Sequence, residues 1–137
     1  MYASFSPFAP PSQQGSVYRK TGVEIDVQSA SPHRLVAMLF EGVMESIAQA
    51  HGAIVAGNLA LKARALRRAV AIVDEGLKAA LDVQQGGRLA NDLGDLYAYI
   101  TLRLTQANLH GDLQALDECK RLLQPLQQAW GQIGDRV

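Results

Sequence analysis

Short connections that contain glycine divide the chain after Ser31 into four long stretches with helical apolar spacing. Ser31 and Pro32 suit the N-cap and the first position of a helix. Further stops fall at Gly57-Asn58, Gly86-Gly87 and Gly111-Asp112, where glycine ends one helix. Helices joined by such short connections run antiparallel to their neighbours. The sequence therefore predicts an all-α protein, an antiparallel up-down four-helix bundle.

The predicted helices cover residues 31–56, 58–84, 89–110 and 112–133. At about 100° per residue, each helix presents an apolar face to a core. The expected core residues are Leu35, Leu39, Val43, Ile47, Ala50, Ile54, Leu66, Val70, Val73, Leu77, Ala80, Leu89, Leu93, Leu96, Tyr97, Ile100, Leu104, Ala107, Leu116, Cys119, Leu123, Leu126, Trp130 and Ile133. Pro125 falls inside the last helix and removes a backbone donor, so we expect a kink or break near Gln124.

Residues 1–28 are predicted to form a flexible N-terminal arm, largely disordered or extended, ahead of a bundle domain of residues 29–137. The first 20 residues contain three prolines among Ser, Gln and Gly, a composition that resists regular structure. Residues 22–28 alternate apolar and acidic side chains, which favours an extended segment lying on the body. Four aromatic residues also lie in the arm, namely Tyr2, Phe5, Phe8 and Tyr18. Either they are incidental to a disordered tail, or the arm docks on an apolar groove of its own bundle and competes with a partner.

The composition excludes several classes of protein. The length of 137 residues and the apolar content of 48% suit one globular domain. Thirteen basic and thirteen acidic residues give no net charge, which argues against nucleic acid or an anionic membrane as the main partner. Cys119 is the only cysteine, so no intrachain disulfide forms. The first residues lack the pattern of a signal peptide, and the run LVAMLF is far shorter than the roughly 20 residues of a membrane span.

Two of the predicted helices carry more apolar surface than a core requires. In residues 58–84 the apolar arc reaches roughly 200°, whereas a helix with one buried side needs about 100°. In residues 89–110 the side chains of Tyr99, Leu102 and Leu109 repeat on the side away from the predicted core. Either this surface is simply exposed or covered by the arm, or it forms a groove for an amphipathic partner helix. The candidate groove residues are Leu61, Ala65, Ile72, Ala79, Tyr99, Leu102 and Leu109.

The sequence contains no constellation typical of metal or covalent chemistry. His33, His51 and His110 lack ligand spacing with one another or with Cys119, and the Glu-x-x-His pairs of a di-iron bundle are missing. No glycine-rich phosphate loop or nucleophile elbow occurs either. We therefore expect no catalytic residue, no metal and no cofactor. One enzymatic alternative is a histidine phosphotransfer bundle that uses His51, but AHGAIVAGN has no lysine shortly after the histidine.

Several stretches, taken together in their order and spacing, resemble one family. They are YRKTGVE, ASPHRLVAMLFEGV, RRAVAIVDEGL, GGRLANDLGDLYAYI, RLTQAN and LQQAW. From about residue 18 to Trp130 the chain resembles FliS, the flagellin-specific export chaperone family. The most specific parts are Ser31-Pro32, the block from Leu96 to Ile100, and Trp130.

This resemblance implies a cytoplasmic, non-enzymatic bundle that binds the disordered C-terminal segment of flagellin. Such a chaperone prevents premature polymerisation and delivers the subunit to the flagellar type III export apparatus. Further expected partners are an export-gate component and other flagellar regulators, and a monomer or weak homodimer is expected. Tyr18 matches the arm tyrosine of the family, whose arm can lie over part of the binding surface, so Tyr18 joins the candidate groove residues. A bundle that sequesters another flagellar protein stays open as an alternative.

For the predicted groove, we expect Ile72→Asp and Leu102→Asp each to weaken client binding while helix content and melting stay largely intact. If either change unfolds the bundle, that residue belongs to the core and the groove lies elsewhere.

Overall fold

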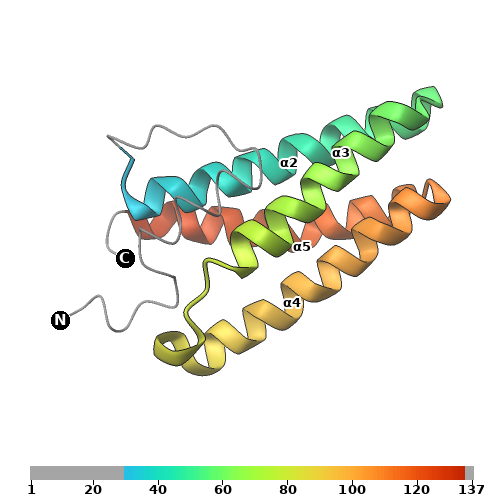
Figure 1. Ribbon diagram of the computed structural model, residues 1–137. Helices are drawn as coiled ribbons and strands as arrows, with labels where there is room; N and C mark the ends of the chain where they lie inside the picture. Colours follow the sequence, from blue (N-terminus) through green and yellow to red (C-terminus); the bar gives the residue numbers. More distant parts are fainter. Residues whose placement is uncertain (1–29, 135–137) are drawn as a thin grey trace.

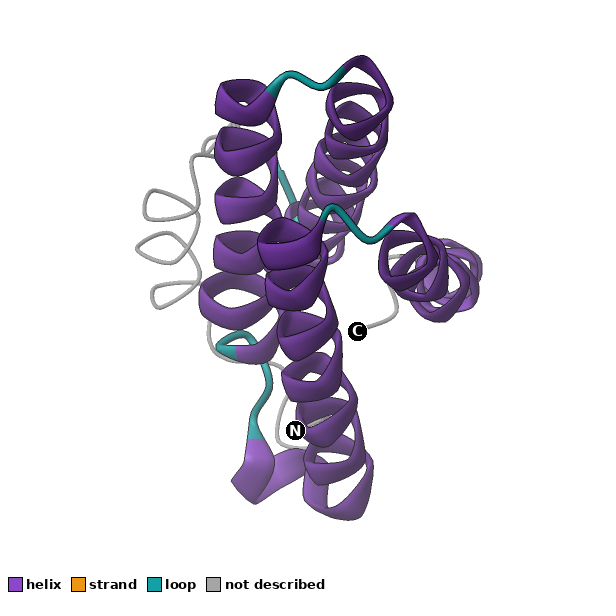
Figure 2. Cartoon of the chain, turned by 90° about the vertical axis from the view of Figure 1, so that its right-hand side faces the viewer, coloured by secondary structure: helices purple, strands orange, loops and turns teal. Residues whose placement is uncertain are grey.

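The computed structural model describes residues 30–134, which fold into an antiparallel bundle (Figure 1). Its elements are α2 (Pro32–Ala56), α3 (Leu59–Ala71), the π-helix η2 (Ile72–Lys78), α4 (Val83–His110) and α5 (Leu113–Ile133). The π-helix continues α3, so the elements form four rods joined by short loops (Figure 2). The four rods form a closed ring in which each rod packs against two others, because α2 contacts α3 and α5, and α4 contacts α3, η2 and α5. The predicted all-α four-helix bundle is confirmed.

Side-chain caps set the helix starts. The Ser31 hydroxyl accepts a hydrogen bond from the Arg34 amide at 3.1 Å, and the Asn58 side chain accepts one from the Leu61 amide at 3.1 Å. These bonds satisfy backbone donors that have no partner inside the helix. Gly57 and Gly111 end α2 and α4 with φ of 73° and 62°, in the left-handed region that glycine enters without strain. The predicted boundaries at these two turns are confirmed.

The boundary between the second and third helices differs from the prediction. The second rod ends at Lys78 rather than near Gln84, and α4 begins at Val83. The reason is Asp82, whose carboxylate accepts a hydrogen bond from the Gln85 amide at 3.1 Å and so caps a new helix. The expected stop at Gly86-Gly87 survives as a break inside α4, where Gly87 has φ 57° and ψ −132°.

The helix break expected near Gln124 is wrong, because α5 continues through Pro125 to Ile133. Pro125 lies on the exposed side of α5. Water can therefore hydrate the backbone carbonyl one turn earlier, which the missing amide leaves without a helical partner.

The core contains most of the expected side chains, and its largest fully buried members include Leu39, Ile100, Leu104, Leu116 and Leu123. Leu89 was expected in the core and is 59% exposed. It lies in the first turn after the break at Gly87, near one end of the rod. Ile133, expected at the end of the core seam of α5, is 38% exposed and lies in the last turn of that helix.

We call the interface between two neighbouring rods a seam. At three of the four seams, polar side chains form hydrogen bonds from one rod to the other, and we call these contacts staples. Between α2 and α3, Arg68 Nη1 donates to Ser46 Oγ at 2.7 Å. Between α2 and α5, Trp130 Nε1 donates to the His33 carbonyl at 2.9 Å, His33 Nε2 donates to the Trp130 carbonyl at 2.7 Å, and the two rings stack. We call this pair the His33–Trp130 clasp. The seam between α4 and α5 is closed by a network around Glu118, described below.

Within residues 30–134, no helix is long and apolar enough to cross a membrane. The division into an arm of residues 1–28 and a bundle from residue 29 stays a prediction, because residues 1–29 and 135–137 lie outside the described part of the chain.

Candidate functional site

The fourth seam, between the α3–η2 rod and α4, is an open groove. Two hollows follow one another along it, of about 400 Å³ and about 240 Å³. The first hollow is lined by Leu66, Arg67, Val70, Ala71, Asp74, Glu75, Leu104, Thr105 and Asn108. The second hollow is lined by Lys78, Leu81, Ala90, Asn91, Gly94, Asp95 and Ala98. We call the two hollows together the α3–α4 groove; in Figure 1 both rods face the viewer.

The first hollow has an apolar floor and a charged wall. Leu66 and Leu104 are fully buried members of the core, and Val70, which lines the same hollow, is half-buried. Charged side chains lie only on the α3–η2 side, because the α4 side of this hollow contributes Leu104, Thr105 and Asn108. An apolar floor with polar edges is the pattern that receives an amphipathic helix.

Exposed leucines extend this apolar surface beyond the hollows. Leu102 is 53% exposed and Leu109 is 71% exposed. Each lies four residues after a lining residue of α4, Ala98 and Thr105 respectively, and residues four apart share one side of a helix. On the opposite rod, Leu59 is 71% exposed and lies two turns before Leu66 on the same side. Both edges of the groove therefore carry leucines that the core does not use.

No polar staple crosses this seam. Among the residues that the structure describes, no side-chain hydrogen bond or ion pair joins α3 or η2 to α4, whereas each of the other three seams has at least one. Between these two rods the described residues therefore make apolar contacts but no side-chain hydrogen bond or ion pair.

The π-helix forms part of the groove wall. Asp74 and Glu75 line the first hollow and Lys78 lines the second, and all three belong to η2. A π-helical segment shifts every later side chain around the axis relative to an α-helix, and such segments are frequent at functional sites. A wheel drawn at 100° per residue therefore misplaces the side chains after Ala71.

Two predicted groove residues, Ala65 and Ile72, belong to the core instead. Ala65 is 3% exposed and Ile72 is 0% exposed. Both lie within the part of the α3–η2 rod that packs against its neighbours α2 and α4, together with Leu66, Ala69 and Val73. This burial leads us to expect, instead, that Ile72→Asp destabilises the bundle.

The other predicted residues do not all share one surface. Leu102 and Leu109 lie on the groove side of α4, as described above. Leu61 is half-buried and lies two turns before Arg68, on the side that faces α2. Ala79 is exposed at the end of η2. Tyr18 lies outside the described residues, so its place in the groove stays a prediction.

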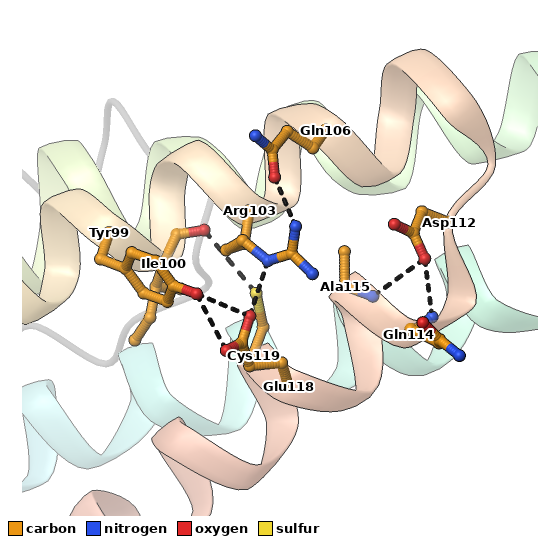
Figure 3. A network of polar contacts seen from close by, with 9 residues as sticks. All are labelled: Tyr99, Ile100, Arg103, Gln106, Asp112, Gln114, Ala115, Glu118 and Cys119. Atoms are coloured by element: carbon orange, nitrogen blue, oxygen red, sulfur yellow. Dashed lines mark hydrogen bonds and ion pairs between the residues drawn. The ribbon is translucent and has the colours of Figure 1, made fainter.

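Tyr99 lies on the other side of α4, toward α5 (Figure 3). Its hydroxyl donates to both carboxylate oxygens of Glu118, at 3.0 and 2.9 Å, and Arg103 Nε donates to the same carboxylate at 2.6 Å. The hydrogen bond from Arg103, with that from Tyr99, holds the pKa of Glu118 below its usual value. The bond to Glu118 also raises the pKa of the Tyr99 hydroxyl. The Tyr99 hydroxyl is thus occupied in stapling α4 to α5.

The remaining candidates for chemistry lie apart. Cys119 is buried, its thiol lies 3.7 Å from the Ile100 carbonyl, and burial raises its pKa to about 12. A thiol of that pKa is a poor nucleophile. His51 lies on an exposed side of α2. In the part of the chain that is described, no three His, Cys, Asp or Glu side chains are placed to hold a metal ion.

Sequence reasoning missed Leu59, Val70, Thr105 and Asn108. Val70 and Thr105 belong to two matching rows, Leu66–Val70 and Thr105–Leu109, at spacing i, i+4, one on each side of the seam. That signal becomes readable only when the facing sides of the two helices are known.

Fold and groove together define a small antiparallel helical bundle with an open groove along one side, apolar at its floor. The family model described as "Flagellar protein FliS" matches residues 14–137. The flagellar secretion chaperone FliS of Salmonella typhimurium is 43% identical over 120 residues, which cover 88% of this chain and 89% of that protein. The flagellar secretion chaperone FliSB of Pseudomonas aeruginosa is 38% identical over 116 residues, covering 85% and 91%. FliS of Escherichia coli is 37% identical over 113 residues, covering 82% and 83%.

The chain belongs to the FliS family of flagellar proteins. The resemblance predicted from the sequence is confirmed, and with it the role of a flagellar secretion chaperone that is not an enzyme.

Proposed function

We propose that this secretion chaperone binds the C-terminal segment of flagellin in the cytoplasm, prevents its premature polymerisation and delivers it to the flagellar type III export apparatus. The names of the relatives support a flagellar secretion client, and the family resemblance indicates flagellin as that client. Contact with an export-gate component during delivery is part of the same proposal.

The observation that carries the proposal is the α3–α4 groove with its exposed leucines. A client segment that folds into an amphipathic helix on this seam covers Leu102, Leu109 and Leu59 and adds a fifth helix to the ring. Full burial of a leucine contributes about 1.5–3 kcal/mol, and ordering a disordered segment costs about 2–5 kcal/mol or more. Because these leucines are already partly covered, all of them and apolar anchors from the client are needed for net binding.

Calorimetry with a C-terminal flagellin peptide from the same organism tests the proposal. We expect one-to-one binding with a negative heat-capacity change, which marks apolar burial. Leu109→Asp and Leu102→Asp should each weaken binding by about five- to thirtyfold, since each loses about 1–2 kcal/mol of apolar contact. The matched control is Val55→Asp on α2, because Val55 is 68% exposed and lines neither hollow.

Two outcomes contradict the proposal. If the folded chain does not bind the peptide, flagellin is not the client and an unbiased pull-down for another flagellar protein is the next step. If Val55→Asp weakens binding as much as Leu109→Asp, the client does not lie in this groove. Removal of residues 1–20 tests the arm separately, and tighter binding after the removal supports a competing arm.

A further inference from the structure

The charged residues that line the first hollow change sign along its length. Arg67 lies near the end of α3, and Asp74 and Glu75 lie seven and eight residues later in η2. At about 1.5 Å per residue, the positive and negative positions are about 10 Å apart, or two helical turns. The α4 side of the hollow has no ionised side chain to offset this order.

These three charges are unpaired within the bundle. In the described residues, Arg67, Asp74 and Glu75 take part in no ion pair and no side-chain hydrogen bond. Other surface charges do pair, as Arg34 does with Glu41 at 2.9 Å. Unpaired charges that border an apolar floor gain most when a ligand covers the floor, because the ligand lowers the local dielectric and removes competing water.

We propose that the first hollow selects an amphipathic client helix by a charge pair, with an acidic side chain opposite Arg67 and a basic side chain opposite Asp74 and Glu75, two turns away. The proposal rests on the proposed function, since it names the chemistry that the client must carry. Apolar side chains between the two charges would pack against Leu66, Val70 and Leu104.

The charge pair also fixes the direction of the bound helix. If the acidic residue precedes the basic residue in the client, the client runs parallel to α3; if the basic residue comes first, it runs antiparallel to α3. A reversal, or a slip of two turns that brings the acidic residue opposite Asp74, would place like charges together, which costs affinity and suppresses wrong registers.

Charge reversal in the full-length chain tests the inference, with the C-terminal flagellin peptide as the probe. Arg67→Glu and Asp74→Lys should each weaken peptide binding by about three- to tenfold at low salt, the scale of solvent-bordering ion pairs. The loss should shrink between about 0.05 M and about 0.5 M salt, because screening shortens the reach of charges. The controls are Lys120→Glu and Asp117→Lys on α5, which change the net charge equally at exposed positions outside the groove.

Rescue then identifies the register. Each acidic residue of the peptide is exchanged for lysine in turn, and one exchange should restore binding to Arg67→Glu while weakening binding to the unchanged chain. One basic-to-glutamate exchange about seven residues away should restore binding to Asp74→Lys. Equal effects of the α5 controls, or the lack of any rescuing exchange, overturn the charge-pair inference while the proposed function stands. Failure of the unchanged chain to bind the peptide removes the proposed function instead.

Discussion

The same substitution at Ile72 and at Leu102 should have opposite consequences for folding. Ile72 is 0% exposed, whereas Leu102 is 53% exposed on the edge of the α3–α4 groove. Truncating a buried isoleucine to alanine already costs about 2–5 kcal/mol, and burying a carboxylate without a partner adds several kcal/mol more. A domain of this size has about 5–15 kcal/mol of stability in total. Ile72→Asp should therefore remove most of the cooperative unfolding transition.

Leu102 is about half buried, so Leu102→Asp loses about half of the free energy that full burial of a leucine contributes. Half of the usual 1.5–3 kcal/mol gives a loss of about 1 kcal/mol, or a fall in Tm of about 4 °C. Thermal unfolding followed by circular dichroism measures both variants, and Ile72→Ala serves as a milder core variant with an expected cost of about 2–5 kcal/mol. A cooperative transition for Ile72→Asp at the temperature of the unchanged chain would refute the burial argument, and so would a Leu102→Asp chain that does not fold.

Three further predictions concern the staples and the thiol. The pKa of Glu118 is lowered in the folded state, so its ionised carboxylate stabilises the fold. The difference in free energy of unfolding between the unchanged chain and Glu118→Gln, measured in urea, should be present above pH about 4.5 and vanish as the pH falls through the lowered pKa. A difference that persists at low pH contradicts this. Trp130→Phe should lower the free energy of unfolding by about 1–3 kcal/mol through loss of the bond to His33, and an unchanged urea midpoint argues against the clasp. Cys119 should react with a thiol reagent at pH 8 far more slowly in the native chain than in urea; equal rates disprove its burial.

Local signals predicted the helix ends well, because caps act over three or four residues. Ser31, Asn58 and Asp112 cap helices in the structure as their residue types predict. Asp82 also caps a helix, but the sequence did not predict it. Apolar residues continue past Lys78, so the second helix was expected to run on through Asp82. Competition between a continuing apolar face and a capping residue is decided by packing, which a single sequence does not display.

Burial around the second rod was not predictable from a helical wheel. The wheel presumes a constant rotation per residue, which does not hold where the last seven residues of the rod form a π-helix. It also assigned Ile72 to the apolar surplus beside the core stripe, whereas Ile72 is fully buried. On α4 the same reasoning correctly found Leu102 and Leu109 exposed.

The distribution of polar staples gives a physical reason why one seam should receive a client. A fifth helix that docks on a seam needs apolar edges. It must not break interhelical hydrogen bonds, since each broken bond leaves an unpaired donor and acceptor, which costs stability. Among residues 30–134, docking at the other three seams would disturb the contacts of Arg68, Glu118 or the His33–Trp130 clasp. At the α3–α4 groove it disturbs no such contact, and it covers leucines that water now surrounds. The staples therefore keep the ring closed on three sides while the fourth side stays available, so binding can proceed without unfolding the bundle.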